Sequence, residues 1–242
     1  MCGIIGFTGR KPAKDILIDG LERLEYRGYD SAGIALLNDD DTLTIRKKAG
    51  RVSELRELCK DGDYSSTCGI GHTRWATHGG VTDANAHPHR CGNVALIHNG
   101  IIENYSDIIR EYGLADKLVS ETDSEVVAAL LDTLYDGDPI AAIRKAVKII
   151  AGSFALCIMF ADRPGIIYAV RNVSPMVAAH SEEGSIIASD LTAIISFSKD
   201  YFVVPEYHIL TMTQEGIRVE DLKGNEVKPQ MLEITWDIPA AQ

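Results

Sequence analysis

A cysteine at the second position constrains what this sequence can fold into more than any other feature. The chain begins MCGIIG, so removal of the initiator methionine would leave Cys2 with a free α-amine. A thiol has an ordinary pKa of about 8.5 and an α-amine one of about 7.7 to 8.0, so one residue then supplies a nucleophile and its base. The apolar pair Ile4-Ile5 predicts a short buried strand that holds this terminus inside the fold. The alternative is an inert Cys2 that packs as a small hydrophobe.

Length and composition indicate a single globular domain. The 242 residues are near the upper end of what one core supports, and the hydrophobic and charged fractions of 45% and 24% are ordinary. The net charge of -11 argues against a nucleic-acid partner, which needs a basic patch to replace counterions. No apolar run is long enough to span a membrane, and no basic region precedes the first apolar run as in a signal peptide. Scattered cysteines without a CxxC pair indicate free thiols in a reducing cytoplasm.

Periodicity predicts an α+β fold with mostly antiparallel sheets, because strands and helices are partly segregated along the chain. Helical spacing predicts helices over 14–24, 53–60, 106–112, 124–134 and 139–150. Alternating or apolar runs between turn residues predict strands over 2–7, 32–37, 43–48, 68–72, 94–98, 154–161, 166–171, 176–180, 186–188, 201–204, 209–213 and 216–220. The segment 73–91 is then a long polar loop, and loops of that length in compact domains tend to be functional.

Several histidines and one cysteine lie in or beside that loop: His72, His78, His87, His89, Cys91 and His98. They lack a tight ligand pair of zinc spacing, so we expect no metal site and no cofactor. A metal or binding module with an inert Cys2 stays open as an alternative to an enzyme.

Five motifs resemble one known family. They are LEYRGYDSAG at 24–33, GHTRWATHG at 71–79, NAHPH at 85–89, HNGIIEN at 98–104 and SETDSE at 120–125. Together they resemble the N-terminal glutaminase domain of the glutamine:fructose-6-phosphate aminotransferases, which are class II glutamine amidotransferases and N-terminal nucleophile hydrolases. The glutaminase domain of the amidophosphoribosyltransferases is the alternative within the same superfamily, but it has Tyr and Ser where this chain has Trp75 and Thr77.

The resemblance implies a fold and an activity. The fold is a four-layer αββα sandwich, in which two antiparallel sheets face each other with helices outside. The activity is hydrolysis of the side-chain amide of L-glutamine to L-glutamate and ammonia through a Cys2 thioester. The resemblance also implies a glutaminase domain over 2–237, a linker that starts at 238–242, and a separate sugar-phosphate isomerase domain that uses the ammonia for glucosamine 6-phosphate. The full-length enzyme would be a homodimer.

The resemblance also assigns the catalytic residues. Asn99 and Gly100 resemble the oxyanion hole, in which a side-chain amide and a backbone N–H meet one developing negative charge. An Asn-Gly pair is also the strongest short signal for a type I′ hairpin, which is the alternative. Arg27 resembles the residue that helps seat the N-terminal cysteine, and the alternative is a cation at a helix C-terminus.

The remaining assignments concern the substrate. Arg74 resembles the arginine that holds the α-carboxylate of glutamine, with a surface ion pair as the alternative. Asp123 resembles the acid that pairs with the α-ammonium, although it also stands where a helix N-cap is expected. The resemblance also counts Gly100 among the substrate-binding residues. Thr77 and His78 resemble the substrate-contacting part of a mobile loop, and Trp75 resembles the lid of that loop over the substrate. The alternative for Trp75 is an ordinary core residue.

Overall fold

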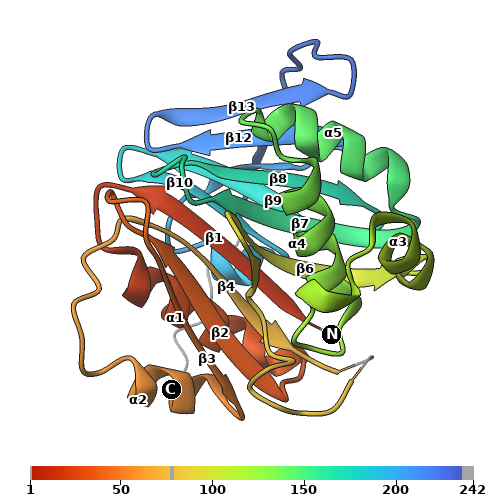
Figure 1. The fold of residues 1–242 in the computed structure, drawn as a ribbon. Coiled ribbons are helices and arrows are strands. Elements are labelled where there is room, and N and C mark those ends of the chain that lie inside the picture. Colours follow the sequence, from red (N-terminus) through yellow and green to blue (C-terminus); the bar gives the residue numbers. More distant parts are fainter. Residues whose placement is uncertain (1, 77–78, 236–242) are drawn as a thin grey trace.

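Two antiparallel β-sheets form the centre of the molecule (Figure 1). The computed structural model describes residues 2–76 and 79–235. The strands of the first sheet are β1 Gly3–Gly9, β2 Ser31–Leu37, β3 Leu43–Ala49, β4 Cys68–Arg74, β9 Val177–Ser181, β10 Gly184–Ala188, β11 Asp200–Val203 and β14 Leu232–Glu233. Those of the second are β5 His89–Cys91, β6 Val94–Ile102, β7 Gly152–Phe160, β8 Ile167–Asn172, β12 His208–Thr213 and β13 Gly216–Asp221. Their orders are β14-β11-β9-β10-β1-β4-β2-β3 and β13-β12-β8-β7-β6-β5.

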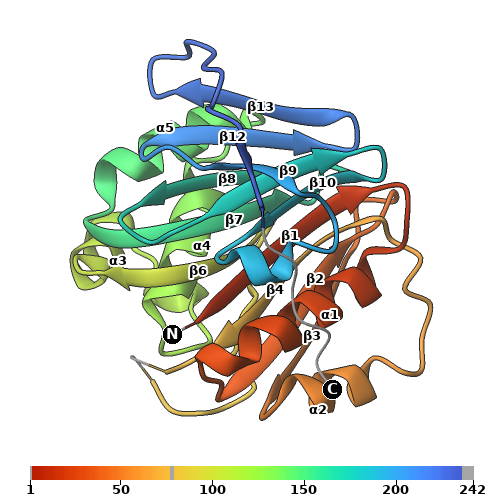
Figure 2. The ribbon, with the colours of Figure 1, turned by 180° about the vertical axis from the view of Figure 1, so that it is seen from behind.

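Helices cover the outer faces of both sheets. The helices are α1 Ala13–Leu24, α2 Val52–Leu58, α3 Tyr105–Tyr112, α4 Asp123–Leu134 and α5 Pro139–Ile149, with 3-10 turns η1 Glu25–Arg27, η2 Ala115–Lys117 and η3 Leu191–Ala193. Figure 1 shows α4 and α5 in front of the second sheet, and Figure 2 shows α1 on the opposite side of the molecule, against the first sheet. This arrangement confirms the predicted αββα sandwich.

Three separate apolar layers fill the spaces between these four layers. One lies between α1 and the first sheet, one between the two sheets, and one between the second sheet and α3 to α5. Successive residues of a strand point to opposite faces. Ile4 therefore packs between the sheets, whereas Ile5 packs towards α1. The Ile4-Ile5 pair thus buries both faces of β1, as the sequence predicted for a strand that holds the N-terminal segment inside.

The N-termini of the helices show where the local sequence was sufficient to predict the start of a helix. Thr122 caps α4 by accepting the Glu125 N–H, and Asp138 caps α5 by accepting the Ala141 N–H before Pro139. The N-terminus of α2 differs from prediction, because this helix begins at Val52 rather than Ser53. The Val52 N–H donates to the Glu25 carboxylate at 2.8 Å, a partner 27 positions away in the sequence.

The Asn99-Gly100 pair does not form a hairpin turn, so that alternative is wrong. Strand β6 runs through both residues to Ile102, and it pairs with β7 at Asn99↔Ala155 and Gly100↔Phe154. Gly100 has φ +130, and a Cβ there would lie 2.1 Å from the Ser153 carbonyl oxygen. Glycine is therefore required for close approach of two paired strands rather than for a turn.

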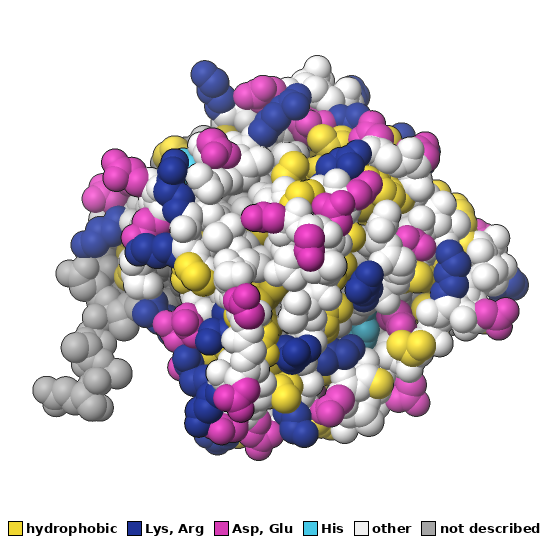
Figure 3. All heavy atoms as spheres, turned by 60° about the vertical axis from the view of Figure 1, so that its left-hand side comes forward, with side chains coloured by type: hydrophobic (Ala, Val, Ile, Leu, Met, Phe, Trp, Pro, Cys, Tyr) yellow, Lys and Arg dark blue, Asp and Glu magenta, His cyan; other side chains and the backbone are white. Residues whose placement is uncertain are grey.

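On the face shown in Figure 3, acidic and basic side chains are interspersed, so the net charge of -11 is not gathered into one area there. Within residues 2–76 and 79–235, no helix is both long enough and apolar enough to cross a membrane. The linker predicted at 238–242 lies outside the described residues.

Candidate active site

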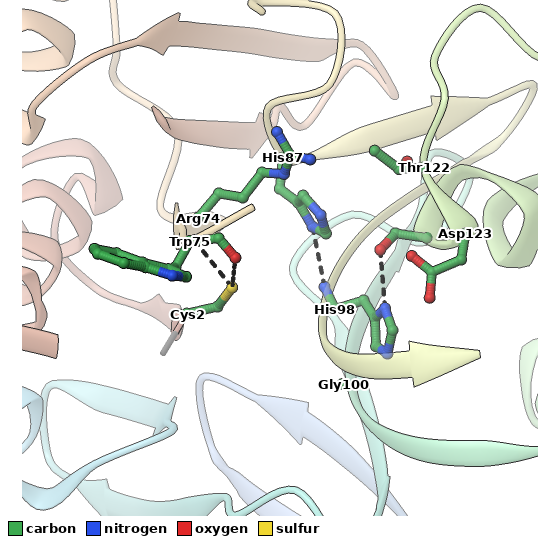
Figure 4. A pocket seen from close by; sticks show the side chains of 9 residues that line it. Cys2, Arg74, Trp75, His87, His98, Gly100, Thr122 and Asp123 are labelled. Carbon is green, nitrogen blue, oxygen red and sulfur yellow. Dashed lines mark hydrogen bonds between the residues drawn. The ribbon is translucent and has the colours of Figure 1, made fainter. Parts of the chain in front are cut away.

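Cys2 precedes β1 and is held by the backbone of Trp75. The Trp75 N–H donates to Cys2 Sγ at 3.1 Å, and the thiol lies 3.5 Å from the Trp75 carbonyl oxygen (Figure 4). Burial raises the pKa of the Cys2 thiol, and the Trp75 N–H opposes this rise because it stabilises the thiolate. The sulfur is therefore a thiol at neutral pH unless a neighbouring base takes its proton.

Asn99 reaches Cys2 from the second sheet. Its side-chain Nδ2 donates to the Cys2 carbonyl oxygen at 3.1 Å, and its Oδ1 lies 3.0 Å from Nε2 of His72. Gly100 is next along β6 and lines the same cavities as Cys2. The structure thus brings together Cys2, Asn99 and Gly100, as the sequence predicted.

Two cavities meet at Cys2. The smaller has about 290 Å³ of empty space, part of it open to solvent, and is lined by Cys2, Arg74, Trp75, His87, His98, Gly100, Thr122, Asp123 and Ser124. The larger has about 1040 Å³ of empty space, also partly open to solvent, and is lined by Cys2, Arg27, Trp75, Asn99, Gly100, Ile101, Ser153, Ser174 and Pro175. Only the smaller one has side chains of both charges in its wall. It is the cavity suited to a small zwitterion.

Arg74 and Asp123 lie on opposite sides of the smaller cavity (Figure 4). The buried Arg74 guanidinium donates to the carbonyl oxygens of Gly80 at 3.0 Å and Gly79 at 3.4 Å. Asp123 is the first residue of α4 and accepts the Ile102 N–H at 2.7 Å. Arg74 is therefore no surface residue, and Thr122 rather than Asp123 is the N-cap of the helix.

Asp30 positions Arg74, a role that was not predicted from the sequence. One carboxylate oxygen lies 3.7 Å from Arg74 Nη1, and the other accepts the Ala76 N–H. The Asp30 N–H also donates to the Arg74 carbonyl oxygen at 2.7 Å. Asp30 belongs to the YRGYDSAG motif, so the signal was present, but only the fold places β4 beside it.

Arg27 hydrogen-bonds to Ser189 and Asp190, next to β1, rather than to the Cys2 thiol. Its guanidinium pairs with Asp190 at 3.2 Å and lies 3.4 Å from the Ser189 carbonyl oxygen. Ser189 in turn accepts the Ile4 N–H with its hydroxyl and donates its own N–H to the Ile4 carbonyl oxygen, both at 3.0 Å. Arg27 thus supports the strand that carries Cys2. Arg27 is also the last residue of η1, so the alternative prediction, a cation at a helix C-terminus, is confirmed as well.

Trp75 is not a core residue, because 53% of its surface is exposed. Its ring packs on Gly28, where a Cβ would lie 2.1 Å from the ring atom Cε3. Gly28 has φ +110, which also favours glycine. The Arg27-Gly28 segment therefore sets the position of Trp75 beside Cys2. Thr77 and His78, which were predicted to contact the substrate, lie outside the described residues.

A cluster of buried histidines joins β4, β5 and β6 to the start of α4. His72 and His87 stack at 4.0 Å between ring centroids, and His87 and His89 meet edge to face at 4.6 Å. His89 Nε2 bonds the Thr122 hydroxyl at 3.0 Å, and His98 Nδ1 bonds the Ser124 hydroxyl at 2.8 Å.

Burial lowers the pKa of each of these imidazoles, that of His72 to about 3. The neutral rings therefore act as hydrogen-bonding groups, and two of them, His87 and His98, line the smaller cavity. Within 2–76 and 79–235, no group of three or more His, Cys, Asp or Glu residues could hold a metal ion. The sequence pattern had pointed to these histidines only as candidate metal ligands.

We expect the protein to lose stability in mild acid because of this cluster. The folded-state pKa of His72, His87, His89 and His98 lies below the ordinary 6.5, so below that pH the unfolded chain holds more protons. The neutral histidines contribute fully to stability above about pH 6.5. Below that pH, each of them lowers the free energy of unfolding by up to about 1.4 kcal/mol per pH unit as the pH falls. Urea unfolding at about pH 7 and about pH 5 measures this. An unchanged free energy of unfolding would show that the imidazoles are protonated when folded.

Comparison with known proteins assigns this chain to a family. A family model described as a glutamine amidotransferase domain matches residues 72–196. The glutamine–fructose-6-phosphate aminotransferases (isomerizing) of Clostridium tetani and Fusobacterium nucleatum are 41% and 43% identical, over all of this chain and 40% of each relative. The chain thus spans about two fifths of the length of the curated relatives it matches.

Solved structures share the fold of this chain. The chain is similar to the glutamine phosphoribosylpyrophosphate amidotransferase of B. subtilis, with a TM-score of 0.79 and 24% identity over 93% of this chain and 50% of that one. A structure described as the allosteric regulatory enzyme of purine biosynthesis gives a TM-score of 0.80 and 25% identity over 91% of this chain and 49% of that one. Identity is thus lower than to the sugar-phosphate aminotransferases. The family match, the fold and the site agree, and the chain belongs to the glutamine amidotransferase family.

Proposed function

We propose that this chain hydrolyses the side-chain amide of L-glutamine to L-glutamate and ammonia, as the glutaminase part of a glutamine–fructose-6-phosphate aminotransferase. The observation that carries this proposal is the position of Cys2 at one end of a small cavity with Arg74 and Asp123 in its walls. Glutamine is a zwitterion with an amide at the other end, and these groups match that distribution of charge. The relatives that cover the whole chain are named for glutamine and fructose 6-phosphate, which supports the same substrate.

In the proposed mechanism the Cys2 sulfur attacks the amide carbon of glutamine. Once Met1 is removed, the α-amine of Cys2 takes the thiol proton, because partial burial raises the pKa of the thiol and leaves it protonated at neutral pH. The Asn99 side-chain amide and the Gly100 backbone N–H donate to the oxygen that becomes negative. Ammonia leaves with the proton returned by the α-ammonium, and water then hydrolyses the thioester. No step uses a cofactor.

In the proposed substrate complex Arg74 binds the α-carboxylate of glutamine and Asp123 binds its α-ammonium. Besides the Asp30 carboxylate, the guanidinium now bonds the neutral carbonyl oxygens of Gly79 and Gly80, and a substrate carboxylate would replace these two carbonyls with one charged, bidentate partner. Asp123 uses Oδ2 for the Ile102 N–H, and Oδ1 is left for the ammonium. Trp75, Thr77 and His78 complete the proposed site on the basis of the sequence resemblance.

We expect Arg74→Lys and Asp123→Asn to raise KM for glutamine strongly and to change kcat less. Lysine keeps the charge but loses the planar fork, and asparagine keeps an acceptor for the Ile102 N–H but loses the charge. A charge-assisted hydrogen bond contributes about 1.5 to 3 kcal/mol, which corresponds to roughly 10- to 150-fold in KM. Steady-state release of glutamate measures this. If KM stays unchanged in both variants, these residues are not in the substrate site.

The whole enzyme is a further part of the proposal. We infer that residues 2–237 are the glutaminase domain and that 238–242 begin a linker to a sugar-phosphate isomerase domain, in a cytoplasmic homodimer. The relatives extend well beyond the length matched here, which supports a second domain. Glutamate and glucosamine 6-phosphate should be assayed together on this chain. We expect glutamate alone, and amino sugar formed from glutamine would place the acceptor site within this chain.

A further inference from the structure

His72 lies at the meeting point of the two sheets, directly behind the proposed oxyanion hole. It is fully buried on β4, where its cross-strand partner is Ile4, two residues after Cys2. From there its ring reaches the second sheet. Nε2 lies 3.0 Å from the His98 carbonyl oxygen and 3.0 Å from Asn99 Oδ1. One ring thus connects the strand beside the nucleophile to the strand that carries the oxyanion donors.

Both of these neighbours are hydrogen-bond acceptors. A backbone carbonyl oxygen and an amide oxygen can accept only, so Nε2 has to carry the proton and donate to both. The other ring nitrogen, Nδ1, is buried and has no hydrogen-bond partner among the described residues. A neutral ring with its proton on Nε2 fits this environment, since a second proton on Nδ1 would be buried without an acceptor.

We propose that His72 is a positioning residue that fixes the orientation of the Asn99 side-chain amide, through the hydrogen bond from its Nε2–H to Asn99 Oδ1. The two ends of an amide have almost the same shape but opposite roles. With Oδ1 held by His72, Nδ2 is the end that faces Cys2 and donates to its carbonyl oxygen at 3.1 Å. This inference rests on the proposed glutaminase function.

The opposite orientation is excluded by two contacts at once. A flipped amide would set Nδ2 against the Nε2–H of His72, donor against donor. It would also set Oδ1 against the Cys2 carbonyl oxygen, acceptor against acceptor. An oxyanion formed on the substrate would then face an oxygen rather than an N–H. The His72 ring stacks on His87 with 4.0 Å between ring centroids. This stacking holds the ring in the plane in which Nε2–H points at Asn99 Oδ1.

The kinetic test compares two replacements of His72. His72→Phe keeps a flat ring without a donor, and His72→Gln keeps an amide N–H near the Nε2 position. Loss of one oxyanion donor lowers kcat roughly 100- to 1000-fold, and we expect His72→Phe to lose about 10- to 100-fold because part of the amide population stays productive. KM for glutamine should change less than about threefold, and His72→Gln should recover much of kcat.

A double-mutant cycle separates this role from a general structural one. With Asn99→Ala as background, there is no amide left to orient, so His72→Phe should cause no further loss of kcat. His89→Phe is the matched control, because it removes another buried imidazole, one that bonds Thr122 and not Asn99. Its effect should persist in the Asn99→Ala background. A loss from His72→Phe that is equally large without the Asn99 amide overturns the inference.

A second measurement does not depend on activity or on the folding of variants. In wild-type protein with ¹⁵N-labelled histidine, long-range ¹H–¹⁵N spectra report which ring nitrogen carries the proton. We expect the Nε2–H form of His72, and an Nδ1–H form overturns the inference. A wild-type protein without Met1 that fails to hydrolyse glutamine contradicts the proposed function instead, so the two failures are distinguishable.

Discussion

Replacing Cys2 with alanine is expected to abolish glutamine hydrolysis and to leave the fold intact. The proposed mechanism has no other nucleophile at this position, and loss of the nucleophile from such a site lowers kcat by at least about a thousandfold. The cost in stability should be small, because Cys2 is only half-buried and precedes the first residue of β1. Glutamate release measures the activity, and circular dichroism with thermal unfolding measures the fold.

Cys91→Ala is the matched control for this variant. Cys91 is likewise a half-buried free cysteine, but it lies on β5, where its sulfur is 3.9 Å from the Asp132 carboxylate and outside both cavities at Cys2. Its replacement should leave glutamate release within about twofold, as for a surface substitution away from the site. Comparable turnover by Cys2→Ala and wild type would show that the reaction does not pass through a Cys2 thioester.

The second large effect is expected from blocking the α-amine while keeping the thiol. One extra residue before Cys2, or Met1 left in place, turns this amine into an amide nitrogen that cannot accept a proton at neutral pH. Because burial raises the pKa of the thiol, the sulfur then stays protonated and glutamine hydrolysis should be lost. A loss of at least about 100-fold is expected, since general-base catalysis contributes roughly 100- to 10000-fold.

Intact mass spectrometry shows which N-terminus each preparation carries, and it should be run on the samples that are assayed. A thiol count on unfolded protein checks that Cys2 is unmodified in both forms. Removal of the extra residue by a protease that leaves Cys2 first should restore activity, which makes the two preparations a matched pair. If the extended protein remains active, another group is the base.

Short-range sequence patterns were enough for most elements. The helical spacing of Ile16, Leu17, Leu21 and Leu24 predicted α1, in which the three leucines are buried and Ile16 is partly buried. The alternation of strands with turn residues placed β7 to β13 within a few residues of the observed ends. The five motifs also pointed to the αββα sandwich through family resemblance. The predictions of helices and strands succeed because helix and strand periodicity depend on neighbours along the chain.

The sequence by itself determined that a cysteine stands second in the chain, predicted a short buried strand after it, and contained motifs that resemble those of a glutaminase domain. Only the tertiary structure decided that Asn99-Gly100 lies within a strand, because the same dipeptide suits a turn until β7 supplies partners for the strand. It alone showed that Asp30 holds Arg74 and that His72 faces Asn99. These pairs form between residues distant in sequence. Their geometry is set by how the sheets pack, which local patterns do not encode.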